Sequence, residues 1–464
     1  MKILYLSSEV APFAKTGGLA DVAGSLPAAL HRKGIDVRVG LPKYQSVKIS
    51  GDETVQDGVS VYFVENRTYF DRPGLYGDKS GDYPDNLERF RFFCEAVLDR
   101  AQAENFRPDL VHCNDWQTAL VPVFLASRFR DEPFWKGVKT VFTIHNLGYQ
   151  GVFPKEAFPK TGLDWSLFHM EALEFYGQAN LLKGGLVFAD RLTTVSPTYA
   201  KEIQTAEFGH GLDGILSKRR EVLTGILNGI DEDQWDPEKD PELVKPFSEK
   251  DPSGKMKNKE DLQRLCRLPQ SAATPLFGMV SRLADQKGID LLIAGMDRFL
   301  SQDVQGVILG SGDPSVETLF QNFSKKFPAK LSVHLKFDPV LAKKIYAGSD
   351  FFLMPSKYEP CGLGQMIALR YGTLPIVRAT GGLADTIVDV EASREGNGFV
   401  FRDYQGDTFL RTIERASRLY RQGAPFAELV RRAFGCGFSW SRSADAYLRL
   451  YESLVPRKEK AVAR

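Results

Sequence analysis

Two adjacent glycines, Gly17 and Gly18, stand between a strand-like run and a helical apolar stripe near the start of the chain. Glycines at a helix N-terminus leave free N–H groups and room for a ligand, and the helix dipole favours an anion there. Lys15 adds a mobile positive charge. The pattern predicts contact with an anionic substrate, and an ordinary tight turn with a solvated lysine is the competing interpretation. It matches neither the dinucleotide fingerprint nor the P-loop pattern.

A second group of charged residues follows two strand-like runs in the other half of the chain. Arg282 and Lys287 follow the run Pro275–Val280, and two cations at a strand end can hold a diphosphate and stabilise it as a leaving group. Glu359 follows the run Phe351–Met354, where a carboxylate can bind sugar hydroxyls or stabilise a cationic transition state. A charge cluster at a helix start is the competing interpretation of both groups.

Polar residues also follow two strand-like runs of the first half. His145 and Asn146 follow one run, and Asp115 and Trp116 follow the other. A lone histidine is more often structural than catalytic. His145 is nevertheless a better catalytic candidate than the other histidines, because it lies at the end of an expected strand. The indole of Trp116 offers a flat face to a sugar ring, although it is equally suited to a core.

A hexapeptide repeat relates the two halves of the chain. Thr16–Asp21 recurs as Thr380–Asp385. The repeat suggests two doubly wound α/β domains with similar turns at the carboxyl ends of their strands, which is where such sheets bind ligands. Two such domains would face each other across an interdomain cleft. The second copy, with Gly381 and Gly382, has no counterpart of Lys15, and we expect it to form a supporting wall of the donor site.

Short apolar runs alternate with amphipathic stretches, which is typical of parallel α/β architecture. The expected strands of the first half are Ile3–Ser7, Val37–Leu41, Val59–Val64, Leu110–Cys113, Thr140–Ile144, Arg191–Val195 and Leu223–Leu227. Those of the second half are Pro275–Val280, Gly306–Leu309, Leu331–Lys336, Phe351–Met354, Leu374–Val377 and Gly398–Phe401. Continuous apolar strands suit sheets that are covered on both faces.

The division between the halves is marked by composition. The segment Asp231–Gly254 is rich in Pro, Asp, Glu and Lys and is typical of an interdomain connection. We therefore expect an N-terminal domain at residues 1–241 and a C-terminal domain at 242–464. A last helix is expected at about 443–455 from its apolar spacing. The sequence does not show which domain this helix packs on, and packing back on the N-terminal domain is left open.

Composition excludes several classes of function. The net charge is +1, from 60 basic and 59 acidic residues, and such a balance argues against nucleic acid as the main partner. The five cysteines are widely spaced with no C-x-x-C, which favours reduced thiols over a disulfide framework. The histidines form no metal-ligand motif, and no apolar run reaches the roughly 18 residues of a membrane span. We expect a cytoplasmic enzyme with no metal, cofactor or membrane partner.

Taken together, the motifs of this chain resemble those of the bacterial glycogen synthases, which are relatives of the plant starch synthases. The resemblance runs over nearly the whole chain, and the order and spacing of the motifs are specific. In chain order they are Lys15-Thr-Gly-Gly-Leu, Leu75-Tyr-Gly-Asp, Asp82-Tyr-Pro-Asp-Asn, His145-Asn-Leu, Thr194-Val-Ser-Pro-Thr-Tyr, Gly225-Ile-Leu-Asn-Gly-Ile-Asp, Ser281-Arg-Leu, Lys287-Gly, Glu359-Pro-Cys-Gly-Leu and Arg378-Ala-Thr-Gly-Gly-Leu.

The resemblance implies a GT-B fold, in which two Rossmann-like domains flank a deep cleft. It also implies retaining transfer of glucose from ADP-glucose to the non-reducing end of an α-1,4-glucan, with release of ADP and without a cofactor. Glycogen or a maltooligosaccharide would be the acceptor.

Roles for individual residues also follow from the resemblance. Lys15 and the Gly17–Gly18 turn would contact the nucleotide sugar, and Arg282 and Lys287 would bind the diphosphate. Glu359 would lie near the donor glucose, and His145 would contact the donor sugar. The substrate-binding residues that the resemblance adds are Asp21, Asp115, Asn146, Asn228, Cys361, Gly362, Leu363, Thr380, Gly381 and Gly382.

The chain departs from the family pattern at three positions. The family often has Thr at the position of Gly364, His at that of Gln117 and Arg at that of Ala379, which leaves donor preference and glucan affinity open.

Three alternative functions are also compatible with the sequence. A sugar-nucleotide epimerase would turn over the nucleotide sugar without a glucan. A glucan phosphorylase would carry pyridoxal phosphate on a lysine in a longer chain. A non-catalytic glucan-binding protein would not need Arg282, Lys287 and Glu359 together.

Overall fold

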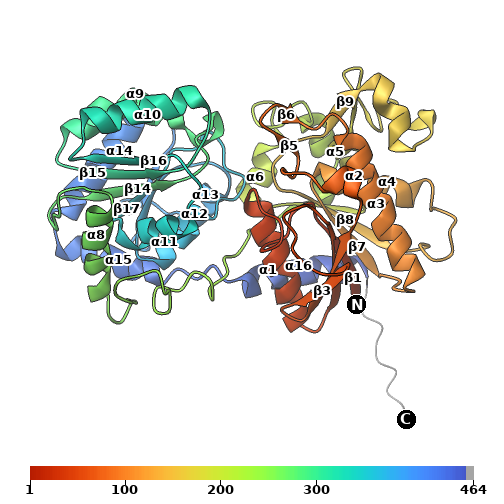
Figure 1. Ribbon diagram of the computed structural model, residues 1–464, viewed down its shortest axis with the longest axis horizontal. Coiled ribbons are helices and arrows are strands. Elements are labelled where there is room, and N and C mark those ends of the chain that lie inside the picture. Colours follow the sequence, from red (N-terminus) through yellow and green to blue (C-terminus); the bar gives the residue numbers. More distant parts are fainter. Residues whose placement is uncertain (456–464) are drawn as a thin grey trace, which may run out of the picture. The chain divides into compact units, whose positions relative to one another are not determined.

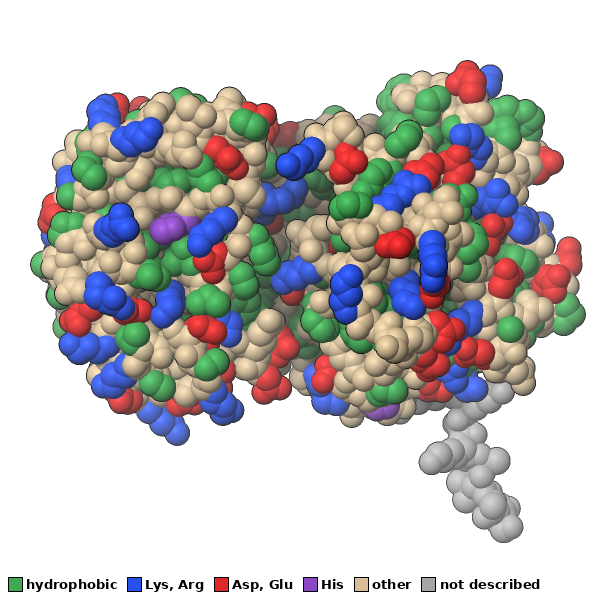
Figure 2. All heavy atoms as spheres, in the orientation of Figure 1, with side chains coloured by type: hydrophobic (Ala, Val, Ile, Leu, Met, Phe, Trp, Pro, Cys, Tyr) green, Lys and Arg blue, Asp and Glu red, His purple; other side chains and the backbone are tan. Residues whose placement is uncertain are grey.

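The computed structural model describes residues 1–455, which form two compact units (Figure 1). The first unit comprises Met1–Gly229 and the C-terminal residues 440–455, and the second comprises Ile230–Ser439. The expected boundary between residues 241 and 242 lies inside the second unit. No helix among residues 1–455 is both long and apolar enough to cross a membrane. Figure 2 shows acidic and basic side chains interspersed over the visible face of each unit.

The first unit is built on a large sheet that the apolar runs predicted. Its strands are β1 (Lys2–Leu6), β2 (Asp36–Pro42), β3 (Glu53–Gln56), β4 (Val59–Val64), β7 (Leu110–Asn114), β8 (Lys139–Ile144), β12 (Arg191–Thr194) and β13 (Leu223–Gly225). They lie in the order β13-β12-β8-β7-β1-β2-β4-β3, and all neighbours pair in parallel except β3 and β4. The strand order reverses between β1 and β7, so their carboxyl ends form the switch point where such sheets bind ligands.

Two small antiparallel sheets are added to the first unit, and helices cover its large sheet. The small strands are β5 (Gly77–Asp78), β6 (Gly81–Asp82), β9 (Val152–Pro154), β10 (Glu174–Phe175) and β11 (Gln178–Asn180). The helices are α1 (Gly18–Arg32), α2 (Arg67–Phe70), α3 (Asn86–Ala103), α4 (Leu120–Ala126), α5 (Leu181–Phe188), α6 (Pro197–Glu202), α7 (Asp213–Lys218) and α16 (Trp440–Leu454). The long helix α1 starts directly after Gly17 and buries the apolar stripe seen in the sequence.

The last helix, α16, belongs to the first unit. It lies beside α1 in Figure 1, where the blue and red ribbons run next to each other. Tyr447 and Tyr451 are fully buried, and the Tyr451 hydroxyl is 2.7 Å from Nδ1 of His112 on β7. Ser443 donates a hydrogen bond of 2.6 Å to the carbonyl oxygen of Leu227. Helix α16 therefore completes the core of the unit to which β1 and α1 belong.

The second unit contains an all-parallel sheet covered by helices on both faces. Its strands are β14 (Leu276–Val280), β15 (Gln305–Leu309), β16 (Leu331–His334), β17 (Phe351–Met354), β18 (Leu374–Arg378) and β19 (Phe399–Phe401). The order is β16-β15-β14-β17-β18-β19, which is the 3-2-1-4-5-6 order of dinucleotide-binding folds. The switch point lies between β14 and β17. The helices are α8 (Ser253–Leu265), α9 (Ile289–Ser301), α10 (Pro314–Lys326), α11 (Pro339–Gly348), α12 (Gly364–Arg370), α13 (Gly381–Thr386), α14 (Gly406–Tyr420) and α15 (Ala424–Phe434).

The segment expected as an interdomain connection is attached to the second unit. Asp240 is buried, and its carboxylate accepts a hydrogen bond of 2.6 Å from the Tyr371 hydroxyl. Asp236 is also buried and lies 3.3 Å from the Arg370 guanidinium. Two of the acidic residues that gave the segment its linker-like composition therefore fix it to the second unit.

Candidate active site

A buried carboxylate that the sequence analysis did not select organises the first Gly-Gly turn. Glu9 lies beyond the end of β1 and is only 4% exposed. Its carboxylate accepts hydrogen bonds from the N–H groups of Thr16 (2.5 Å) and Gly17 (3.1 Å), from the Thr16 hydroxyl (2.6 Å) and from the Tyr76 hydroxyl (2.8 Å). Glu9 therefore holds the loop that leads into α1. An acidic residue just past a strand end was the signal available, as it was for Asp115.

Gly17 is not required by the packing of its own unit. Its φ of −152° is extended backbone that any residue adopts, and a Cβ built on it would meet no described atom within 4 Å. Lys15 Nζ lies 2.6 Å from an Asp21 carboxylate oxygen, and both side chains are partly exposed. The first turn of α1 therefore combines open space at Gly17, a helix N-terminus without a side-chain cap and a nearby cation, which suits an anionic group.

The carboxyl ends of β7 and β8 bring Asn114, Asp115 and His145 together. The N–H of His145 donates a hydrogen bond of 2.7 Å to the Asp115 carboxylate, and His145 Nε2 lies 2.8 Å from the Asn114 side-chain oxygen. The Asn114 amide nitrogen donates to Leu6 O, so its oxygen faces the imidazole and Nε2 carries the proton. Asp115 has a φ of +55°, an unusual backbone conformation that is common at functional sites.

Burial shifts the pKa values of this group. It lowers the pKa of His145 to about 3 and raises that of Asp115 to about 7, while backbone hydrogen bonds from His145 and Asn146 partly oppose the second shift. Burial also lowers the pKa of His112 to about 3. At neutral pH the His145 ring is therefore uncharged, and it suits hydrogen bonding to a sugar better than pairing with a phosphate.

We expect these shifts to govern the acid stability of the first unit. His112 and His145 stay neutral when folded, so below about pH 6.5 the unfolded state takes up their protons and stability falls as pH falls. Asp115 acts in the opposite sense, because its stabilising proton is lost as pH rises through about 7. Burial lowers the pKa of His210 in the same unit as well. Below about pH 6.5 these histidines together outweigh Asp115, so the unfolding free energy should fall as the pH is lowered.

The measurement is denaturant unfolding of the first unit at several pH values. His112→Gln should reduce this acid dependence, because it removes one of the histidines that stay neutral in the folded state. His31→Gln, at an exposed position, should keep the wild-type slope. A slope unchanged in His112→Gln would contradict the prediction.

The second unit joins Lys287 and Glu359 at its switch point. Lys287 precedes α9 in the loop after β14, and Glu359 lies in the loop after β17. Lys287 Nζ is 2.9 and 2.7 Å from the two carboxylate oxygens, and the Ser356 hydroxyl donates a further hydrogen bond of 3.0 Å to Glu359. Glu359 is 5% exposed, so the contact is a mostly buried ion pair. Arg282 follows β14 directly and has an exposed side chain.

The second Gly-Gly turn packs directly on the Glu359 loop. The N–H of Gly382 donates to Glu359 O (3.1 Å) and to Pro360 O (3.2 Å). A Cβ at Gly381 would lie 1.9 Å from Glu359 O, and a Cβ at Gly382 would lie 2.1 Å from Cys361 O. These two glycines are therefore required by contact within the protein, whereas Gly17 is not.

The remaining predicted residues lie beside Glu359 or beside His145 in the chain, with one exception. Cys361, Gly362, Leu363 and Thr380 border the Glu359 loop. Asn146 follows His145, and its side-chain oxygen accepts from the Gly148 N–H. Asn228 lies beyond β13, away from the β7–β8 group, and its buried side-chain oxygen accepts no hydrogen bond from residues 1–455. Within the same range, no group of three His, Cys, Asp or Glu side chains could hold a metal ion.

Two family models match the two units. The starch synthase catalytic domain matches residues 2–218, and glycosyl transferases group 1 matches residues 268–427. The chain is 49% identical to a glycogen synthase of Syntrophotalea carbinolica over 98% of this chain and 99% of the relative. It is 46% identical to a glycogen synthase of Moorella thermoacetica over 100% of this chain and 98% of that relative.

Solved structures agree with these sequence relatives. The catalytic domain of Arabidopsis thaliana starch synthase IV, bound to ADP and acarbose, superposes with a TM-score of 0.90 at 35% identity, covering 98% of this chain and 99% of that chain. A sucrose-phosphate synthase of Thermosynechococcus elongatus, at 18% identity and a TM-score of 0.63, shows the fold alone. The expected GT-B architecture and glycosyltransferase activity are confirmed, and the chain belongs to the glycogen synthase family.

Proposed function

We propose that this glycogen synthase transfers glucose from ADP-glucose to the non-reducing end of an α-1,4-glucan, with retention of configuration and release of ADP. The observation that carries the proposal is the Lys287–Glu359 pair at the switch point of the parallel sheet in the second unit. The related Arabidopsis starch synthase domain was solved bound to ADP and acarbose, and this supports an adenine nucleotide donor and a glucan-like acceptor.

The second unit would supply the charge that the leaving group needs. Lys287 is oriented by both oxygens of Glu359, so its ammonium group is already in place when a diphosphate arrives. Arg282 would add a second cation from its exposed position after β14. Preorganised cations of this kind stabilise the charge that develops on a departing diphosphate. Glu359 would then face the donor glucose, where its carboxylate stabilises a cationic transition state.

The first unit would contribute polar contacts to the donor. Lys15 and the open turn at Gly17 and Gly18 would contact the nucleotide sugar. The neutral imidazole of His145 would accept a hydrogen bond from a glucose hydroxyl at Nδ1, because its Nε2 proton is directed at Asn114. Asp115 holds the His145 backbone, so it acts on the substrate mainly through that residue. The departing diphosphate oxygen would accept the proton of the acceptor hydroxyl, so the step needs no separate protein base.

The test uses the full chain with ADP-glucose or UDP-glucose, in the presence or absence of glycogen. We expect ADP release that requires glycogen and matches glucose incorporated into the glucan, with UDP-glucose much the poorer donor. Nuclear magnetic resonance of the product should show new α-1,4 linkages. Turnover of the nucleotide sugar without a glucan would favour an epimerase and would overturn the proposal, as would the absence of turnover with both donors.

A further inference from the structure

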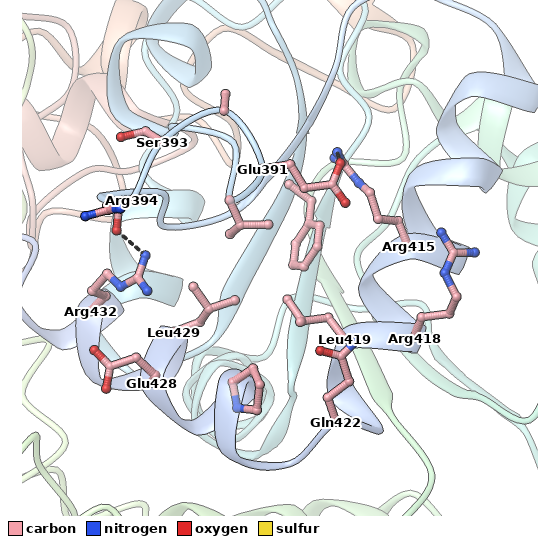
Figure 3. Close-up of a pocket in the computed structure, with 14 residues that line it drawn as sticks. Glu391, Ser393, Arg394, Arg415, Arg418, Leu419, Gln422, Glu428, Leu429 and Arg432 are labelled. Atoms are coloured by element: carbon pink, nitrogen blue, oxygen red, sulfur yellow. Dashed lines mark hydrogen bonds and ion pairs between the residues drawn. The ribbon is translucent and has the colours of Figure 1, made fainter.

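The second unit contains a cavity of about 730 Å³ that the catalytic residues do not line. Its walls are the segment 390–394, which precedes β19, and parts of α14 and α15 (Figure 3). Parallel strands place this segment toward the amino-terminal edge of the sheet, whereas Glu359 follows the carboxyl-terminal end of β17. The cavity is therefore a separate feature of the unit, and the transferase reaction leaves it unexplained.

Four arginines contribute to the walls of the cavity. In Figure 3, Arg394 and Arg432 lie on one side, and Arg415 and Arg418 lie on the other. Arg415 is neutralised by Asp389 at 2.5 Å and by Glu391, which also lines the cavity, at 2.7 Å. The other three make no ion pair with a carboxylate of residues 1–455.

One of these unneutralised cations is held in place by the backbone. The Arg432 guanidinium donates hydrogen bonds to the carbonyl oxygens of Arg394 (2.5 Å) and Gly396 (3.3 Å). Glu428 also lines the cavity, but it pairs at 3.6 Å with Arg431, a residue outside the lining. The cavity therefore has an excess of positive charge, and at least one of its guanidinium groups is preoriented.

The floor of the cavity is apolar. Phe399 is fully buried, and Leu429 is 5% exposed. Leu419 and Leu429 lie between the two arginine pairs in Figure 3. A bare inorganic ion would leave this floor uncovered, whereas a molecule with an organic body would cover it. The planar guanidinium group of arginine can donate two parallel hydrogen bonds to two oxygens of one phosphate. The volume of the cavity is in the usual range for small-molecule sites.

We propose that this cavity binds a small organic phosphate, with the phosphate held by Arg394 and Arg432 on one side and the organic body packed on the apolar floor between them and Arg418. A sugar phosphate and a nucleoside monophosphate share this chemistry. The inference concerns a site separate from the Lys287–Glu359 pair, and it stands whether or not the proposed donor is correct.

Isothermal titration calorimetry of the full chain tests the proposal. The titrations are repeated with Lys287→Ala, so that binding at the catalytic residues is recognised by its loss in that variant. Glucose 6-phosphate and AMP are the two probes, and glucose and adenosine are their uncharged controls. We expect one equivalent of at least one phosphate to bind, more weakly at higher salt because the contact is ionic, and no heat from the uncharged controls.

Variants then assign the binding to the cavity. Arg394→Ala should weaken phosphate binding at least about tenfold, which is the usual effect of losing one charge-assisted contact. Arg394→Lys should recover part of the loss, because it restores the positive charge without the planar guanidinium group. Arg411→Ala removes an exposed arginine of α14 that lies outside the cavity, and this variant should bind like the wild type.

The two probes also distinguish the sources of the phosphate. Tighter binding of glucose 6-phosphate would identify a sugar phosphate, and tighter binding of AMP would identify a nucleotide. Arg394 is exposed, so its variants are expected to fold, and their thermal unfolding serves as the check. No binding of either probe at millimolar concentration would overturn the proposal. Equal weakening by Arg411→Ala and Arg394→Ala would also overturn it.

Discussion

Replacing Lys287 by alanine is expected to lower kcat by roughly 100-fold or more, because the diphosphate loses a preoriented cation as charge develops on it. The same change leaves the Glu359 carboxylate, which is 5% exposed, without its ion-pair partner. Breaking a buried pair by removing one partner typically costs about 3–5 kcal/mol. Turnover with ADP-glucose and glycogen and the unfolding free energy of the second unit should therefore be measured on the same preparation.

A double variant separates the chemical effect from the structural one. Lys287→Met combined with Glu359→Gln removes both charges, so most of the lost stability should return while turnover stays low. Lys357→Ala is the matched control, because Lys357 pairs with Asp285 at 3.2 Å on the same two loops with both side chains exposed. It should change kcat little. Wild-type turnover in Lys287→Ala would remove Lys287 from the proposed mechanism.

The two Gly-Gly turns should respond in opposite ways to an added methyl group. Gly381→Ala would place a Cβ 1.9 Å from Glu359 O at a residue whose φ is +44°. We expect a loss of roughly 3 kcal/mol or more in the unfolding free energy of the second unit, since both overlap and backbone strain oppose the change. Gly17→Ala meets no described atom and has an extended φ, so stability should be unchanged.

The effect of Gly17→Ala should appear in substrate binding instead. If the donor approaches the first turn of α1, a methyl group there should raise KM for ADP-glucose about tenfold or more. Gly437→Ala is a suitable control, because a Cβ there also meets no described atom and the position belongs to neither group. Equal destabilisation by Gly17→Ala and Gly381→Ala would show that the turns do not differ as described. An unchanged KM in Gly17→Ala would remove that turn from the donor site.

The large sheets could be predicted because their parallel strands are buried on both faces. Phe351–Met354 is a continuous apolar run, Val59–Val64 is apolar except for Ser60, and both are strands at those bounds. The strand Glu53–Gln56 was not predicted, because it pairs antiparallel at a sheet edge and carries charged and polar residues in partly exposed positions. Its identity as a strand comes from its neighbour β4 and not from its own apolar content.

The candidate site was predictable as residue types but not as contacts. Lys287 and Glu359 could be selected because each follows a parallel strand. Their pairing depends on β14 lying next to β17, which no local pattern reveals. Glu9 was missed because its role is to accept hydrogen bonds from a loop several residues later. The linker-like composition of residues 231–254 was misleading in one respect, since Asp236 and Asp240 are anchored to the second unit.

The placement of α16 bears on how the chain folds as it is synthesised. The second unit begins and ends at adjacent backbone positions, with the Ile230 N–H donating 2.8 Å to Phe438 O. It is therefore a continuous insertion that can close while the chain is still attached to the ribosome, because domains tend to fold as units during synthesis. The first unit must wait for Tyr447 and Tyr451, which are synthesised after the whole second unit. A premature stop shortly before residue 440 would thus spare the later-encoded unit and leave the earlier one incomplete.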